Sequence, residues 1–192
     1  MAQLAKKAIL QAFTELLDGK PMDKITVMDI VERCDITRGC FYYHFQDIYA
    51  VFEEMLRIET ERMLSYDSAS ESWEEDFIAA ASFLYQNRKI VYNIYNSAHR
   101  EELYRYVKKA VEVVIDSAVE RASQGISATP EDKKAVSRFY QFALQGAFLE
   151  WAETGMKEPL EGLIRQFGRL FRGNILQALE RSAGSKEKAL PG

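Results

Sequence analysis

The chain has 192 residues with 25 basic and 29 acidic side chains, which gives a formal net charge of −4 at pH 7. Hydrophobic residues make up 47% of the sequence, enough for a buried core, so a wholly disordered chain is excluded. No apolar stretch reaches the roughly 18 residues that a membrane-spanning helix requires. The first residues form an amphipathic pattern rather than a secretion signal, and the two cysteines, Cys34 and Cys40, match no disulfide framework or zinc site. We therefore expect a cytoplasmic protein, and the acidic net charge argues at first against nucleic acid as its partner.

Apolar residues recur at the spacing of one helix face, and no segment shows the sustained alternation of a half-buried strand. The sequence therefore predicts an all-α fold of about nine helices. The first helix is expected over residues 2–18, where one apolar stripe contains Ala5, Ala8, Ile9, Ala12, Phe13 and Leu16. Two short helices follow over 27–34 and 38–45, each preceded by a threonine as N-cap, and a fourth is expected over 47–64.

More helices are predicted beyond the polar segment 65–72, which is interpreted as a loop. The fifth helix starts at a capping box formed by Ser72 and Glu75, and the eighth starts after Thr129, with a proline at its first position. The predicted ranges, in chain order, are 73–87, 89–96, 101–123, 130–155 and 159–181. Residues 183–192 are expected to form a flexible tail.

The most specific pattern in the sequence is TVMDIVERCDITRGCFYYHF, over residues 26–45. A capped helix, a two-residue turn and a second capped helix are typical of a helix-turn-helix. The side chains spaced to pack between the two helices are Ile30, Val31, Cys34, Ile36, Phe41 and Phe45. The outer face of the second helix is left with Thr37, Arg38, Gly39, Cys40, Tyr42, Tyr43 and His44. Each of these is small or can form hydrogen bonds, and the N-terminus of the helix also offers backbone N–H groups to a phosphate.

With its flanking segments KKAILQAFTELL and DIYAVFEEML, this pattern resembles the TetR/AcrR family of bacterial transcription regulators. The resemblance covers about residues 4–60 and implies a three-helix DNA-binding domain over 1–46, followed by a helical effector-binding and dimerisation domain over 47–182. The phosphate contacts that it implies are made by Thr26, Tyr42, Tyr43 and His44. The base contacts that it implies, at the tip of the recognition helix, are made by Thr37, Arg38, Gly39 and Cys40. Among them, Arg38 is suited to a bidentate contact with guanine.

Two positions depart from the family pattern. Asp35 stands in the turn where the family usually has glycine, and aspartate tolerates the left-handed conformation that such a turn requires. Ile48 stands near the start of the fourth helix, where the family often has lysine, so one expected phosphate contact is missing.

The family resemblance implies that the last two predicted helices pair with their copies in a second subunit. The residues favour the same interpretation, because the segment FYQFALQGAFLEW is apolar around most of its circumference. The following helix adds an apolar stripe of Leu160, Leu163, Ile164, Phe167, Leu170 and Phe171. We therefore expect a homodimer formed through about 130–155 and 159–181, since two half-sites about 34–36 Å apart require two-fold symmetry. The alternative is that these faces fill the core of a monomer.

The middle helices are rich in aromatic residues, with a few polar residues among them, as expected for a small-molecule pocket. The candidate lining residues are Phe77, Tyr85, Tyr92, Tyr95, Asn96, His99, Tyr104, Phe139 and Gln145. Aromatic residues at helical spacing also form ordinary cores, so pocket and core both remain open. His99 and Glu102 share a helix face that a metal could use, but a solvated helix start is the better interpretation, and no metal or cofactor is expected.

The sequence thus predicts a DNA-binding transcription regulator, acting as a ligand-responsive homodimeric repressor on a palindromic operator. The alternative is an activator or adaptor controlled by a partner protein. It is suggested by the segment YNIYNSAHREELYRYV, which loosely resembles TetR-like regulators of the dihydroxyacetone kinase activator subgroup. No motif of an enzyme active site is present, so no enzymatic activity is expected.

The distribution of charge removes the objection raised by the acidic net charge. Residues 1–50 carry six basic and seven acidic side chains, whereas 51–80 carry two basic and nine acidic ones. The acidic residues therefore follow the helix-turn-helix rather than forming its tip. The lysine and arginine contacts with phosphate are expected to be few, made by Lys6, Lys7, Lys24 and Arg38. Non-specific DNA binding should accordingly be weak and shallow in its salt dependence.

Overall fold

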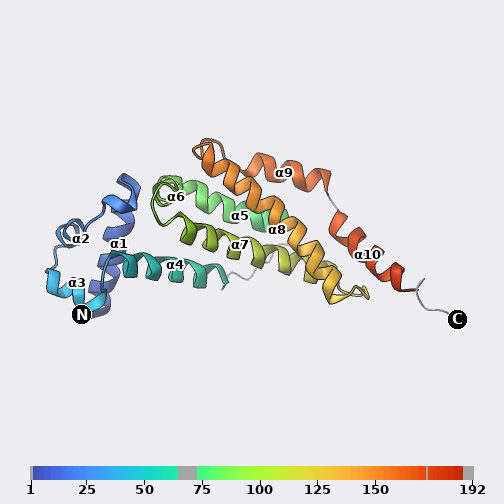
Figure 1. The fold of residues 1–192 in the computed structure, drawn as a ribbon, viewed down its shortest axis with the longest axis horizontal. Helices are drawn as coiled ribbons and strands as arrows, with labels where there is room; N and C mark the ends of the chain where they lie inside the picture. Colours follow the sequence, from blue (N-terminus) through green and yellow to red (C-terminus); the bar gives the residue numbers. More distant parts are fainter. Residues whose placement is uncertain (1, 65–72, 172, 188–192) are drawn as a thin grey trace. The chain divides into compact units, whose positions relative to one another are not determined.

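The computed structural model describes residues 2–64, 73–171 and 173–187, and over these ranges the chain is helical, with no strand (Figure 1). This confirms the predicted all-α fold. The chain divides into two compact units, one formed by residues 1–67 and 86–106 and the other by 68–85 and 107–192. The predicted functional boundary between residues 46 and 47 stays a prediction.

The first unit contains the predicted DNA-binding helices. Its elements are α1 (Ala2–Gly19), a short 3-10 helix (Met22–Lys24), α2 (Val27–Arg33), α3 (Arg38–His44), α4 (Ile48–Leu64), α6 (Arg88–Tyr95) and the first residues of α7 (Arg100–Ala122). The stripe predicted on α1 faces the core, where Phe13 of α1 and Phe52 of α4 meet edge to face with ring centroids 6.5 Å apart. Other fully buried side chains are Ile9, Leu17, Ile30 and Phe41. The helix-turn-helix is thus fixed by apolar packing against α1 and α4.

Helix α6 is attached to this unit by polar contacts as well as by packing. The side-chain amide of Asn93 donates to the backbone carbonyl of Leu17 at 2.7 Å. In the turn after α6, the backbone N–H of Ala98 donates to the Asp23 carboxylate at 3.2 Å. The ring of His99 then packs against Tyr49 of α4, with centroids 4.5 Å apart. The α6–α7 turn is therefore part of the same unit as the helix-turn-helix.

The second unit contains α5 (Trp73–Gln86), the rest of α7, α8 (Pro130–Glu153), α9 (Glu161–Leu170) and α10 (Asn174–Glu187). Thr129 caps α8 as predicted, because its hydroxyl accepts the backbone N–H of Asp132 at 3.0 Å. The core includes the buried side chains Ile115, Leu144, Phe148, Trp151, Ile164 and Leu179. The indole N–H of Trp151 donates to the carbonyl of Glu158 at 2.5 Å, which closes the α8–α9 turn.

The prediction of one helix over 159–181 was wrong, because this range forms two helices. Gly173 has a φ of +75°, a left-handed conformation that does not continue a helix, and it separates α9 from α10. Helix α10 also continues to Glu187, beyond its predicted end near Arg181. The predicted loop 65–72 with the cap at Ser72, and residues 188–192 of the predicted tail, lie outside the described residues.

Candidate nucleic-acid interface

The two helices of the helix-turn-helix start at the threonine caps that the sequence predicts. Thr26 forms a capping box with Asp29, in which the Thr26 Oγ1 accepts the Asp29 N–H at 3.2 Å and the Asp29 carboxylate accepts the Thr26 N–H at 2.7 Å. Hydrogen bonds from Thr26 and Lys20 lower the pKa of Asp29 to about 2. At α3, the Thr37 Oγ1 accepts the Cys40 N–H at 3.2 Å. These caps fix where both helices begin.

The turn between α2 and α3 contains a residue in the left-handed region. Asp35 has a φ of +51°, as expected at the position where the family usually has glycine. Cys34 closes α2 as its C-cap, and its thiol donates to the Ile30 carbonyl at 3.0 Å. Burial raises the pKa of the Cys34 thiol, so this cysteine acts as a packing residue.

The recognition helix α3 separates buried from exposed side chains as the sequence predicts. Phe41 is buried and, with Phe45 just after the helix, anchors α3 to the core. Arg38 and Gly39 are exposed, as are Tyr42 and Tyr43, whose exposed fractions are 56% and 77%. Cys40 and His44 are half-buried at the edges of this face. The predicted base-contacting residues thus share the exposed N-terminal turn of α3, whereas their contacts with DNA stay a prediction.

Gly39 is not required by the packing of the protein itself. A Cβ atom at this position would meet only the Thr37 Oγ1, at 3.8 Å, which is an ordinary van der Waals contact. Because the helix leaves open space here, glycine would allow a close approach of the backbone to a ligand.

The structure reveals a neighbour of Arg38 that sequence reasoning missed. Arg38 Nη2 lies 3.6 Å from the sulfur of Met28, the second residue of α2. Met28 is 44% exposed although it is apolar, whereas Ile30 and Val31 on the same helix are buried. Met28 lies outside the apolar stripe that α2 buries, and this place in the helical pattern was the feature of the sequence that could have indicated its exposure.

Two of the three lysines predicted to contact phosphate, Lys6 and Lys7, differ in their surroundings. Lys7 is exposed, and in the described part of the chain no acidic side chain pairs with it. Lys6 pairs with Glu54 of α4 at 2.7 Å and lies 5.7 Å from the centroid of the Phe45 ring. Hydrogen bonds from Arg57 and Lys6 lower the pKa of Glu54 to about 2. Lys6 is therefore already held in an ion pair within the protein, through a carboxylate that it shares with Arg57.

The predicted effector-lining residues are divided between the two compact units. Those in the first unit are Tyr92, Tyr95, Asn96, His99 and Tyr104, and those in the second unit are Phe77, Tyr85, Phe139 and Gln145. Tyr92, Asn96 and Phe139 are exposed, while Phe77 and Gln145 are buried. Tyr85 packs against Trp151, with ring centroids 6.4 Å apart. Their role in ligand binding stays a prediction.

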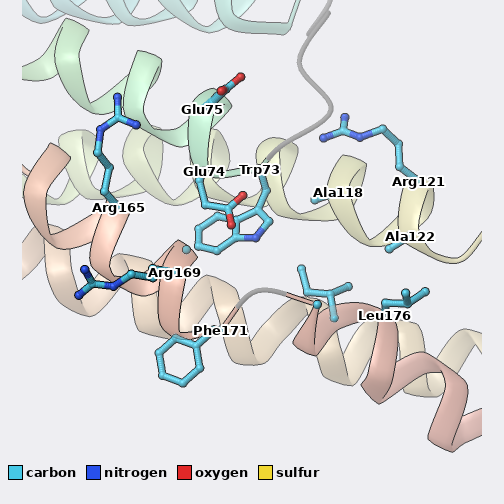
Figure 2. A pocket seen from close by; sticks show the side chains of 13 residues that line it. Trp73, Glu74, Glu75, Ala118, Arg121, Ala122, Arg165, Arg169, Phe171 and Leu176 are labelled. Atoms are coloured by element: carbon cyan, nitrogen blue, oxygen red, sulfur yellow. The ribbon is translucent and has the colours of Figure 1, made fainter.

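The second unit contains a groove of about 740 Å³ that none of these predicted residues lines (Figure 2). Its apolar walls include Trp73, Ala118, Phe171 and Leu176, and its charged residues include Arg121, Arg165 and Arg169. Trp73 belongs to the aromatic-rich middle helices, so the aromatic composition of that region was the feature of the sequence that could have indicated this groove.

The walls of the groove are held by close contacts. The Trp73 ring meets Tyr140 edge to face, with centroids 5.9 Å apart. Arg121 pairs at 3.3 Å with Asp76, which is buried. Gly168 allows α9 to approach α5, because a Cβ atom there would lie 2.5 Å from the Glu74 side chain. A groove of this size and composition can hold a small amphipathic molecule.

Helix α8 carries apolar side chains on its exposed face. Phe139 and Phe142 are 69% and 58% exposed, and the guanidinium of Arg138 lies 5.5 Å from the centroid of the Phe142 ring. At Gly146, on the same helix, an added Cβ atom would meet no atom within 4 Å. Exposed apolar rings next to a glycine are the features expected of a helix that packs on another chain.

The described ranges also bear on metal binding and on membrane insertion. Over these residues, no three His, Cys, Asp or Glu side chains form a group that could hold a metal ion. His99 lies 3.9 Å from Glu102, as the shared helix face predicts. No described helix is long and apolar enough to cross a membrane.

Comparisons with known proteins agree with the helix-turn-helix. The family model described as "Bacterial regulatory proteins, tetR family" matches residues 9–55. A second model, described as "Transcriptional regulator C-terminal region", matches residues 71–173, which is more than half of the chain. No curated protein sequence matches this one.

Solved structures with a similar fold include the dihydroxyacetone kinase operon activator DhaS, at 18% identity and a TM-score of 0.74, over 93% of this chain and 98% of that chain. A TetR transcriptional regulator from Streptococcus agalactiae 2603V has 18% identity and a TM-score of 0.56, over 94% and 96%. NalD, the secondary repressor of the MexAB-OprM multidrug efflux pump in Pseudomonas aeruginosa, has 18% identity and a TM-score of 0.57, over 93% and 98%. At this identity, the likeness concerns the fold alone. Because the two family models together cover both its helix-turn-helix and most of its remaining helices, the chain belongs to the TetR family of bacterial transcription regulators.

Proposed function

We propose that this protein is a homodimeric repressor that binds a palindromic operator and is released by a small-molecule effector. The observation that carries the proposal is the exposed first turn of α3, where Arg38 and Gly39 follow the Thr37 cap. A helix of this kind reads base edges in the major groove, with arginine contacting guanine through two hydrogen bonds. The phosphate contacts around this turn are made by Thr26, Tyr42, Tyr43 and His44.

The homodimer is supported by the exposed apolar face of α8. A palindromic operator presents two half-sites one helical turn apart, about 34–36 Å, and a two-fold dimer presents two recognition helices to them. Phe139 and Phe142 give α8 an apolar surface that pairing with a second copy would cover.

Effector control is supported by two features of the separate units. The groove beside Trp73 offers an apolar binding surface in the second unit. In the first unit, the α6–α7 turn is hydrogen-bonded to Asp23 beside the helix-turn-helix. A ligand that favours one conformation of α7, which runs through both units, would alter operator affinity, and the operator would weaken ligand binding by the same factor.

Selection from a randomised duplex library with the purified full chain tests the DNA-binding part of the proposal. We expect enrichment of a palindrome with a guanine in each half-site. Arg38→Ala should abolish the preference for that guanine, and Tyr43→Phe should weaken binding to all sequences alike. Failure to enrich any palindrome would contradict the proposed function, and unchanged binding by both variants would contradict the residue roles.

A thermal-shift screen of small molecules tests the effector part. Candidate effectors should raise the melting temperature and release the operator. Trp73→Leu should abolish both responses if the effector binds in the groove, whereas Tyr95→Phe should do so if the predicted aromatic residues of the first unit form the site. A ligand that stabilises the protein without releasing DNA would argue against effector control.

A second candidate function is an activator controlled by a partner protein. Similarity in fold to DhaS, named as an operon activator, favours it. A reporter gene fused to the selected operator separates the two candidates, since deletion of the protein should raise expression for a repressor and lower it for an activator. Co-purification with products of neighbouring genes would identify the partner. Regulators of this family are in general DNA-binding proteins without enzymatic activity.

A further inference from the structure

We propose that Met28 determines operator specificity by contacting the methyl group of a thymine adjacent to the guanine read by Arg38. The inference rests on the proposed function, because it requires that the exposed turn of α3 enters the major groove. It adds a residue of α2 to the base contacts that the proposed function assigns to α3.

The position of Met28 relative to Arg38 is the main support. The sulfur of Met28 lies 3.6 Å from Nη2 of Arg38, so the two side chains touch across the angle between α2 and α3. Met28 is two residues after the Thr26 cap, and Arg38 is the first residue after the Thr37 cap. Because the sulfur touches the guanidinium, a base next to the one that Arg38 contacts lies within reach of the methionine side chain.

The chemistry of methionine restricts what it can recognise on DNA. Its thioether has no hydrogen-bond donor and is a weak acceptor, so it provides neither a phosphate contact nor a hydrogen bond to a base donor of useful strength. Its flexible, polarisable chain adapts well to apolar surfaces. In the major groove the apolar group on a base edge is the C5 methyl of thymine. Thymine is therefore the base that Met28 can distinguish.

The contact also affects Arg38. An exposed arginine side chain samples many rotamers and loses this freedom when it forms a bidentate contact. Packing against Met28 restricts the guanidinium before DNA binds, so the guanine and thymine contacts should be coupled. The selected half-site is accordingly expected to contain a guanine–thymine or thymine–guanine step.

Replacement of single thymines by deoxyuridine tests the inference, since this change removes only the methyl group. The operator selected with the wild-type protein is used with the full chain in a binding titration. Uracil next to the guanine of one half-site should weaken binding about fourfold, the value of one buried methyl group, and about 15-fold when both half-sites are changed. Uracil at the other thymines should have little effect.

Variants at positions 28 and 38 complete the test. Met28→Ala should bind the thymine operator at least as weakly as the wild type binds the uracil operator, because it also frees Arg38, and it should be insensitive to uracil. Met28→Leu should keep the sensitivity, because it keeps an apolar side chain. Arg38→Ala should lose guanine preference but still discriminate thymine from uracil. Circular dichroism shows whether each variant is folded, as expected for substitutions at exposed positions.

The outcomes distinguish this inference from the proposed function. If no DNA sequence is enriched by the wild-type protein, the proposed function fails. If an operator is enriched but lacks thymine beside the guanine, or if wild type and Met28→Ala respond equally to uracil, DNA binding stands and the role of Met28 is overturned. A Met28→Ala variant that loses guanine preference without any change at thymine would make Met28 a support for Arg38 only, which also overturns the proposal.

Discussion

Asp35 occupies the turn between α2 and α3 in a strained backbone conformation. Its φ of +51° lies in a region that is unfavourable for residues with a Cβ atom, although aspartate is among those that tolerate it. We predict that Asp35→Gly raises the free energy of unfolding by about 0.5–1 kcal/mol, because relief of strain exceeds the extra chain entropy of glycine. Asp35→Ala should lower it by about 1 kcal/mol. Urea denaturation at pH 7 measures both, and a glycine variant no more stable than wild type would contradict the argument.

Glu54 links α1 to α4 through charge, since Lys6 and Arg57 both donate to its largely buried carboxylate. Its pKa is about 2, lowered from 4.5, so ionised Glu54 stabilises the fold above pH 4.5, and this contribution is lost as the pH falls from about 4.5 through 2. We predict that Glu54→Gln lowers the free energy of unfolding at pH 7 by about 2 kcal/mol and flattens its decline in acid. The decrease in the free energy of unfolding that the variant still shows in acid should include a contribution from Asp29, whose pKa is also about 2.

Chemical denaturation at a series of pH values from 7 to 2 provides the measurement. Glu53→Gln is the matched control, because Glu53 is the exposed neighbour on the same helix and makes no ion pair with the described residues. Equal pH profiles for the two variants would show that Glu54 does not stabilise the fold through its charge.

At the scale of helices, substitutions at two N-caps can distinguish an effect on stability from an effect on DNA binding. Thr26 caps α2 at the predicted DNA interface, and Thr129 caps α8 in the other unit, each through a hydrogen bond to the backbone N–H three residues later. We predict that Thr26→Ala and Thr129→Ala both reduce stability by about 1 kcal/mol. Only Thr26→Ala should also weaken operator binding, which a mobility-shift assay at constant salt can compare. Similar DNA affinities of the two variants would remove Thr26 from the interface.

The helices whose limits depend on local signals were predicted well. Thr26, Thr37 and Thr129 start helices as expected, and Asp35 adopts the left-handed turn, because capping and turn geometry depend on neighbours within a few residues. The break between α9 and α10 was missed, since the apolar stripe continues across it while Gly173 changes the backbone direction. Glycine tolerates both helical and left-handed conformations, and only tertiary packing decides between them.

Contacts between distant segments were the part that could not be predicted. The pairing of Lys6 with Glu54 depends on how α1 packs against α4, and the contact of Met28 with Arg38 depends on the angle between α2 and α3. For the same reason the sequence left open whether the aromatic residues of the middle helices line a pocket or fill a core. Periodicity shows which face of each helix is apolar, but it does not show that Tyr95 and Tyr85 belong to different compact units.

At the scale of the whole molecule, the exposed rings of α8 make dimerisation testable independently of DNA. We predict that Phe142→Arg dissociates the proposed dimer, because it removes an apolar contact and places a second cation beside Arg138 in each subunit. Loss of one buried hot-spot residue should raise the dimer dissociation constant at least 30-fold, the equivalent of about 2 kcal/mol. The variant should stay folded, since Phe142 is largely exposed within one chain.

Sedimentation equilibrium at micromolar concentration measures the change, and Leu4→Arg is the control, because Leu4 is an exposed apolar residue in the other unit. If α8 forms the interface, only Phe142→Arg should become monomeric and lose the affinity gained from two half-sites, while its binding to a single half-site is unchanged. Half-site binding is kept because the recognition helix belongs to a different compact unit from α8. A Phe142→Arg protein that remains dimeric would place the interface elsewhere, and one that loses half-site binding as well would show that the units do not fold independently of this surface.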